Sequence, residues 1–293
     1  MNYAIENEKL KVIVSTCGAE LQSIYGKTSN FEYLWQGSEE FWKSRATNIF
    51  PNCGRLWEGK YIYKGKSYEL PCHGFIKLHE FEVVSFSPKK ITLKLTDNEE
   101  TKKVYPFSFS FSITYSLENN TLKTEFLVEN TGDETLPFAL GGHPGFNLPL
   151  QEGLEFSDHY LEFENKCKAK KLALSETCFY TGENEPFTLK KSQIIPLKHS
   201  MFNNDAIFLT GTDKIVTLKS DKCERYVKVK YPDMPSVGFW HNPKTEAPFI
   251  CIEPWSGVPG LDGVIEDFEK RENFTYLPAN EKYVNGFEIE VNE

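Results

Sequence analysis

The chain has 293 residues, of which 33 are basic and 42 acidic, giving a formal net charge of −9. This balance gives no support for nucleic acid or an anionic membrane as a partner. An apolar fraction of 40%, with 23 Phe and 14 Tyr, provides a sizeable core and favours strands over helices.

The beginning of the chain, Met1 to Glu8, lacks a basic segment followed by an apolar one, so we expect no signal peptide. No apolar run is long enough to span a membrane. Seven scattered cysteines without a C-x-x-C pair predict free thiols in a reducing cytoplasm.

Alternation with period two dominates the chain. Residues 107–115 (FSFSFSITY) predict a half-buried strand with its Phe side chains on the core. Similar patterns predict strands at 91–96, 122–128, 226–231 and 287–291. Helical signals are scarce: we expect one turn at 39–43 and another at 261–270. Residues 1–293 are therefore predicted to form a single all-β domain of antiparallel strands in two packed sheets, with few short helices.

The most informative segment is Ile250 to Trp255 (ICIEPW), where Glu253 ends an apolar, strand-like run directly before a proline. The proline biases Glu253 to an extended backbone. The segment therefore predicts a strand that delivers a carboxylate to a cleft; the alternative is a strand-end charge that is paired or solvated.

A second segment, Phe138 to Pro144 (FALGGHP), delivers His143 in the same way. The two glycines before it permit close approach of another backbone or of a ligand. One acid and one base, each before a proline, indicate acid/base chemistry on a β scaffold.

Other candidates lie in turn-like contexts beside glycines, where functional loop residues concentrate. These are His73 in LPCHGF and Arg55 in FPNCGRL. Four aromatic residues are candidate surfaces for stacking a sugar ring: Trp240, Trp255, Phe50 and Phe146.

Metal and nucleotide chemistry lack support in the sequence. His73 and His79 would share one face of a continuous strand, but no third ligand stands at a characteristic spacing, so we predict no metal site. Phosphate-binding loops, dinucleotide fingerprints and the G-x-S-x-G elbow are absent.

Together these segments resemble the aldose 1-epimerase (galactose mutarotase) family, and within it the LacX-like branch. The resemblance runs over essentially the whole length. It is carried by the order and spacing of GAELQSI (18–24), FPNCGRLWEG (50–59), CHGF (72–75), GHPGFN (142–147) and IEPW (252–255). It implies a large antiparallel β-supersandwich.

The resemblance also implies roles for individual residues. Glu253 matches the catalytic base and His143 the catalytic acid, while His73, Arg55 and Asp205 match sugar-binding positions. The implied reaction opens and recloses a hexose ring: a base deprotonates the C1 hydroxyl, an acid protonates the ring oxygen, and neither a metal nor an organic cofactor takes part. The reference pKa values of Glu and His suit a Glu⁻/His⁺ pair near neutral pH, and a neighbouring carboxylate would favour the charged imidazolium. The expected partner is a small-molecule sugar, with a homodimer as one option for the assembly.

Three departures from the family pattern leave the substrate open. Cys53-Gly54-Arg55-Leu56 replaces G-R-x-x-N-R-I, and Pro144 to Leu148 replaces Y-F-N-L. The C-terminal L-x-P-G-E pattern loses its glycine in Leu277 to Glu281.

Three alternatives remain at this point. A hexose-6-phosphate 1-epimerase needs additional cations, for which Arg45 and Lys77 are the visible candidates. A non-catalytic sugar-binding protein on the same scaffold would not need a matched acid and base. A glycoside hydrolase would need a second carboxylate in an equally telling context, which we do not find.

Overall fold

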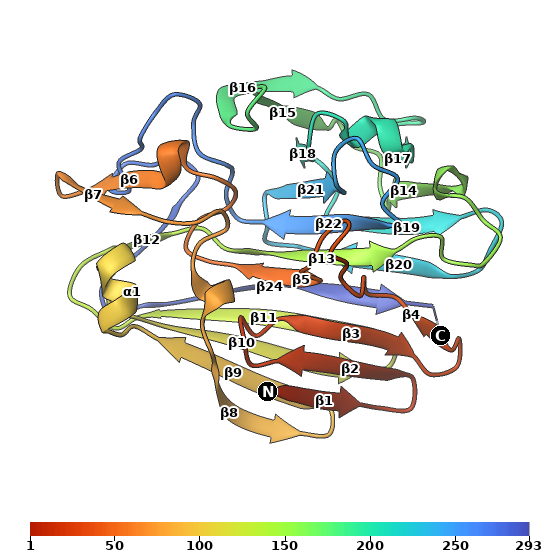
Figure 1. Cartoon of the computed structure of the whole chain (residues 1–293), viewed down its shortest axis with the longest axis horizontal. Coiled ribbons are helices and arrows are strands. Elements are labelled where there is room, and N and C mark those ends of the chain that lie inside the picture. Colours follow the sequence, from red (N-terminus) through yellow and green to blue (C-terminus); the bar gives the residue numbers. More distant parts are fainter. Residues whose placement is uncertain (293) are drawn as a thin grey trace.

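The computed structural model describes residues 1–292; Glu293, the last residue of the predicted domain, lies outside the described part. Nearly all of the regular structure is antiparallel β-sheet (Figure 1). The all-β prediction is therefore confirmed, whereas the assignment of 1–293 to a single domain stays a prediction.

The larger of two main sheets has nine strands. Their order is β17 (Ile194–Pro196), β14 (His159–Phe163), β19 (Ile215–Ser220), β20 (Tyr226–Lys230), β24 (Lys282–Val291), β11 (Thr121–Asn130), β10 (Phe109–Glu118), β9 (Lys90–Thr96) and β8 (Glu82–Ser87).

The second main sheet has seven strands and carries the candidate site. Their order is β16 (Tyr180–Pro186), β15 (Lys170–Leu174), β18 (Ile207–Thr210), β21 (Ser236–Trp240), β22 (Phe249–Trp255), β13 (Gly141–Asn147) and β5 (Ala46–Ile49).

Smaller elements complete the fold. A four-stranded sheet comprises β1 (Asn2–Glu6), β2 (Leu10–Ser15), β3 (Leu21–Gly26) and β4 (Phe31–Glu32). Two-stranded sheets pair β6 (Lys60–Tyr63) with β7 (Lys66–Glu69), and β12 (Leu136–Phe138) with β23 (Thr275–Leu277). The helical elements are α1 (Glu99–Val104) and the 3₁₀ turns η1 (Trp57–Gly59), η2 (Ile76–Leu78), η3 (Phe156–Asp158) and η4 (His199–Phe202).

Aromatic side chains join the two main sheets. Phe50, which follows β5, stacks on Phe111 of β10 with ring centroids 4.8 Å apart, and Phe109, Phe111 and Ile113 are all fully buried. The predicted alternation therefore does place the Phe face of this strand on the core.

That strand is nevertheless more buried than predicted. Ser110 and Ser112, on its opposite face, are also buried. They lie in register beside Glu129, Lys94 and Leu127, whose longer side chains shield short serines from water.

Both predicted helical turns are wrong. Residues 39–43 form bends in which the amide of Ser38 donates to the carbonyl of Trp42 at 2.9 Å. In 261–270 the backbone bonds outward: the amide of Ile62 donates to Glu266 O, and the amide of Phe268 donates to Ile62 O, each at 2.9 Å. Because β6 takes these groups, they cannot form helix-internal bonds.

The α-helix that does form, α1, was not predicted. The side chain of Asn98 accepts from the amides of Glu100 and Thr101, and the Thr101 hydroxyl accepts from the amide of Asn98, which makes a capping box. The helix is six residues long and almost entirely polar, so it leaves no apolar periodicity in the sequence.

Candidate active site

Adjacent strands bring Glu253 and His143 together. Glu253 lies on β22 and His143 on β13, two neighbouring interior strands of the seven-stranded sheet. The glycines before His143 permit this packing, since a Cβ on Gly141 would lie 2.5 Å from the carbonyl oxygen of Pro254, and one on Gly142 would lie 2.6 Å from the Phe287 ring. The Gly-Gly signal therefore reflects close packing on both sides of β13.

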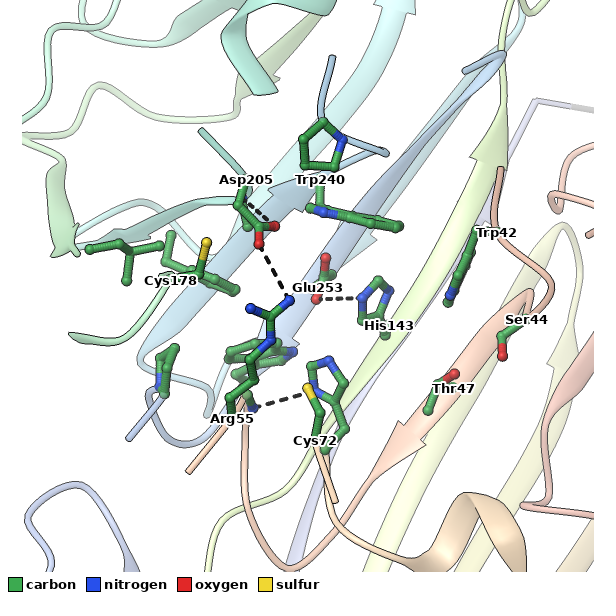
Figure 2. A pocket seen from close by; sticks show the side chains of 18 of the residues that line it. Trp42, Ser44, Thr47, Arg55, Cys72, His143, Cys178, Asp205, Trp240 and Glu253 are labelled. Atoms are coloured by element: carbon green, nitrogen blue, oxygen red, sulfur yellow. Dashed lines mark hydrogen bonds and ion pairs between the residues drawn. The ribbon is translucent and has the colours of Figure 1, made fainter. Parts of the chain in front are cut away.

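The acid and base face each other across 3.2 Å, measured from Nε2 of His143 to Oε2 of Glu253 (Figure 2). Glu253 is only 1% exposed. Neither of its carboxylate oxygens, nor Nδ1 of His143, has a hydrogen-bond partner within the described chain. A buried carboxyl whose one ion-pair contact is an imidazole is costly to fold, which makes Glu253 a candidate for the chemistry of the site.

Burial controls the protonation of the pair. It raises the pKa of Glu253 well above its usual value, and the negative charge of Asp205 adds to the effect. Burial also lowers the pKa of His143 to about 3, with a further contribution from the charge of Lys77. The directions of both shifts favour a neutral carboxyl beside a neutral imidazole over the expected Glu⁻/His⁺ pair.

His73 stands edge-on to His143, with ring centroids 5.3 Å apart. Its Nδ1 accepts from the amide of Gly54 at 3.3 Å. Burial, followed by the charges of His143, Lys77 and Arg55, holds its pKa well below the usual value. A neutral imidazole that accepts at Nδ1 carries its proton on Nε2, so His73 is a hydrogen-bond donor.

We call Glu253 and His143, which lie on strands, the floor of the site. Arg55 and Asp205 lie at its other end. Nη2 of Arg55 is 3.8 Å from Oδ2 of Asp205, and Nη1 of Arg55 donates to the carbonyl of Thr177 at 3.4 Å. Asp205 has a φ of +74° and accepts from the amide of Ala206 at 2.9 Å. Both residues come from connecting segments outside the strands.

These groups line one cavity of about 400 Å³, a volume suited to a small ligand. All six residues predicted from the sequence contribute to it: Glu253, His143, His73, Arg55, Asp205 and Trp240. Trp255 also lines the cavity. The prediction was wrong for Phe50 and Phe146, which are fully buried in the main core.

The sequence model of the aldose 1-epimerase family matches residues 1–269. The chain belongs to the aldose 1-epimerase family. Protein LacX of Lactococcus lactis subsp. lactis is 33% identical over 267 residues, covering 88% of each chain. A galactose mutarotase related enzyme from Lactobacillus acidophilus is 36% identical with a TM-score of 0.95, covering 100% of this chain and 98% of the other. A galactose mutarotase-like protein from Lactobacillus casei is 29% identical, also with a TM-score of 0.95 and full coverage of both chains. The predicted family and β-supersandwich are thus confirmed, and membership indicates a carbohydrate epimerase.

Sequence reasoning missed several residues that line the cavity of this aldose 1-epimerase family member. Trp42 is the most prominent, with its ring tilted by 31° against His143 at a centroid distance of 4.8 Å. The others include Ser44, Thr47, Phe208 and Cys178. They stand in segments without glycine or proline signals, so only the tertiary arrangement identifies them.

Two residues considered for other roles lie elsewhere. His79 is separated from His73 by the 3₁₀ turn η2, so the two do not share a strand face. Arg45, considered for phosphate, instead donates from Nη1 to the carbonyl of Gln22 at 2.7 Å and does not line the cavity.

The structure also forms a cluster that sequence spacing could not predict. Possible metal-ligand atoms of His143, Cys251 and Glu253 all lie within 4.8 Å of one another, and all three residues are buried. This donor set is of the kind that zinc accepts.

No helix in the described part of the chain is long and apolar enough to cross a membrane.

Proposed function

We propose that this chain is an aldose 1-epimerase that interconverts the α and β anomers of a hexose, with Glu253 as general base and His143 as general acid. The observation that carries the proposal is the buried carboxyl without hydrogen-bond partners, 3.2 Å from an imidazole, at the floor of a sugar-sized cavity. Family membership supports the same reaction class.

The reaction needs one proton shared by the pair. Glu253 takes the proton of the C1 hydroxyl as the C1–O5 bond breaks, and His143 gives a proton to the ring oxygen O5. The open-chain aldehyde turns about C1–C2. The ring then closes on the other face of the aldehyde as O5 attacks C1. The O5 proton returns to His143, and Glu253 returns its proton to the C1 oxygen.

Ligand binding favours the charge distribution that this direction requires. Burial raises the pKa of Glu253, but sugar hydroxyls that donate to Glu253 stabilise its ionised form. The 3.2 Å separation is short enough for the proton to pass to His143. We assign His73, through Nε2–H, to stabilise charge that develops on a sugar oxygen.

The remaining groups orient the ring. Arg55 and Asp205 offer donors and acceptors for hydroxyls, and Trp240 offers an aromatic face for the apolar side of the sugar. None of these roles requires a metal or an organic cofactor.

The test is polarimetry of freshly dissolved α-galactose and α-glucose with wild type, Glu253→Gln and a matched control, Glu162→Gln on the distant strand β14. We expect wild type and the control to accelerate anomer exchange, and Glu253→Gln to lose about 10²–10⁴-fold of the acceleration. If the wild-type protein binds sugar without accelerating exchange, a binding protein replaces the enzyme. If Glu253→Gln keeps the full rate, the assigned base is wrong.

A further inference from the structure

A third side chain able to bind a metal lies beside the floor, because strand geometry brings Cys251 to it. Cys251 and Glu253 are two residues apart on β22, so their side chains point to the same face of the sheet. The register of β13 against β22 pairs Gly145 with Cys251, and the same register sets His143, two residues earlier, opposite Glu253. The carboxyl group therefore has the imidazole beside it on the next strand and the thiol beside it on its own strand.

The donor atoms of these three side chains are close enough to share one ion. Candidate ligand atoms of His143, Cys251 and Glu253 all lie within 4.8 Å of one another, and Nε2 of the imidazole is 3.2 Å from Oε2 of the carboxyl group (Figure 2). Ligands on a tetrahedral zinc ion stand about 3.3–3.8 Å apart, given bonds of about 2.0–2.3 Å. The shortest separation therefore fits already, and the longest needs a shift of about 1 Å.

The polar atoms of this cluster lack other partners. Neither oxygen of Glu253 nor Nδ1 of His143 has a hydrogen-bond partner within the described chain, and Glu253 is 1% exposed. Buried polar groups in native proteins are nearly always paired, so such atoms need an explanation. A cation held between the three residues would pair the atoms that the fold leaves without a partner.

The cavity gives an ion access to the cluster. His143 and Glu253 line the cavity, whereas Cys251 does not and packs in a separate apolar cluster. A Cβ added to Gly145 would lie 3.4 Å from Sγ of Cys251 and 3.3 Å from the ring of Trp42, so the thiol lies beneath this tryptophan. An ion that enters through the cavity meets the floor first and binds the thiol below it. Its fourth position then faces the cavity, as in zinc sites with three protein ligands.

The donor set selects zinc among the common divalent ions. Thiolate and imidazole ligands suit zinc, whereas Mg²⁺ and Ca²⁺ take oxygen ligands. A thiolate and a carboxylate together carry two negative charges, which match the charge of Zn²⁺, and the imidazole binds as the neutral ring. All three ligands bind deprotonated, so the thiol and carboxyl protons pass to solvent as the zinc bonds form.

We propose that His143, Cys251 and Glu253 bind Zn²⁺ reversibly, and that the bound ion stops anomer exchange. Zinc binding stands independently of the proposed function. The inhibition rests on the proposed function, because the ion occupies the acid and the base that the reaction needs. Zinc is thus an inhibitor that competes with the sugar for the floor, and not a cofactor.

The first experiment measures zinc binding to metal-free protein by calorimetry in wild type, Cys251→Ala and two controls. Cys53→Ala removes an equally buried thiol, which donates to the carbonyl of Leu140, and Cys72→Ala removes a thiol that lines the cavity. We expect the Kd for Zn²⁺ to rise by roughly 100-fold or more in Cys251→Ala, since changes outside the ligand shell alone cost about 10–100-fold. Both controls should stay near wild type. Cobalt(II) in place of zinc should give a sulfur-to-cobalt charge-transfer absorption that Cys251→Ala abolishes.

The second experiment follows anomer exchange of galactose with and without zinc, and compares each variant with its own zinc-free rate. Wild type and the controls should lose exchange at zinc concentrations near their Kd, and Cys251→Ala should need roughly 100-fold more zinc, in line with its weaker binding. Zinc affinity that Cys251→Ala leaves unaltered overturns the proposed site. Zinc that binds through Cys251 without slowing exchange overturns the inhibition.

The two readouts separate this proposal from the proposed function. Zinc binding that depends on Cys251, in a protein that exchanges no anomers, upholds the zinc site while the epimerase fails. Circular dichroism shows whether each variant is folded. Glu253→Gln replaces a second ligand by a poorly coordinating amide, so it should weaken zinc binding as Cys251→Ala does, and it tests the site even where the cysteine variant does not fold.

Discussion

The floor of the cavity and its Arg55–Asp205 end are built differently. On the floor, Glu253 and His143 sit on adjacent central strands, are almost fully buried, and leave polar atoms without partners. At the other end, Arg55 and Asp205 come from connecting segments, and their side chains are 52% and 20% exposed.

Under the proposed function, this difference separates the reacting groups from the groups that recognise the sugar. The floor holds its two groups at 3.2 Å on strands whose positions the sheet determines, which suits a proton transfer that tolerates little movement. The partly exposed ion pair at the other end spans 3.8 Å and contributes little stability, so we expect it to rearrange around hydroxyls of different configuration.

The largest expected effect tests whether the floor acts as a unit. His143→Asn should lower kcat by about 10²–10⁴-fold, as should Glu253→Gln, because each removes one partner of the same proton transfer. The double variant should be hardly slower than the slower single variant, since groups that act together are not additive.

Single-turnover rates of anomer exchange for the three variants measure this coupling. A double variant whose loss equals the product of the two single losses would show that the residues act independently. The comparison would then lose its main premise.

The sequence predicted the floor better than the rest of the site, for a physical reason. The proline after each residue favours an extended backbone, and both residues do lie in strands, although inside β22 and β13 and not at the strand ends that their apolar runs predicted. Period-two patterns likewise predicted strands such as β10 and β11, because a strand with one face on the core alternates apolar and polar residues.

The missed residues depend on contacts between distant segments. Trp42 and Thr47 look like ordinary aromatic and strand residues until β5 pairs with β13. The wrong helix at 261–270 has the same origin, because its backbone groups are taken by β6. Local patterns carry no record of such pairings.

The loop that carries His73 and Gly74 tests whether a connecting segment can be packed as rigidly as the floor. Gly74, beside His73, has a φ of +73°, and a Cβ there would lie 2.0 Å from the carbonyl oxygen of Phe50. We expect Gly74→Ala to lower the free energy of unfolding by about 2 kcal/mol or more, through both backbone strain and this clash. Gly153, with a φ of +84° and nothing within 4 Å of its would-be Cβ, is the matched control for strain alone.

Urea denaturation of Gly74→Ala and Gly153→Ala gives the two losses. Equal losses would mean that the Phe50 contact yields at no cost, and that the His73 loop is as adaptable as the segments that carry Arg55 and Asp205.

The pH dependence of stability distinguishes the floor in a second way. The raised pKa of Glu253 contributes stability below its unfolded value of about 4.5 that is lost as the pH rises. The lowered pKa of His143 contributes stability above its unfolded value of about 6.5 that is lost as the pH falls. Between these values the two slopes oppose each other, and comparison with Glu253→Gln isolates the Glu253 slope because both proteins keep His143.

Relative to Glu253→Gln, wild type should therefore lose stability as the pH rises above about 4.5, by up to about 1.4 kcal/mol per pH unit. Denaturation midpoints of both proteins from about pH 4.5 upward measure the difference. A difference that stays constant directly above about pH 4.5 would show that the pKa of Glu253 is not raised in the folded protein.

The smallest expected effect on stability lies at the Arg55–Asp205 end. Asp205→Asn removes the negative charge of an exposed pair, so we expect the free energy of unfolding to change by less than about 1 kcal/mol. The same change should raise KM for the sugar by about 10-fold, because a charged acceptor for hydroxyls is lost, while kcat falls far less than in Glu253→Gln. Steady-state kinetics beside urea denaturation separates the two quantities.

If Asp205→Asn instead lowers kcat as strongly as the floor variants, with KM unaltered, Asp205 takes part in the proton transfer. Since the charge of Asp205 also helps to raise the pKa of Glu253, that outcome would extend the reacting unit from the strands into the connecting segments.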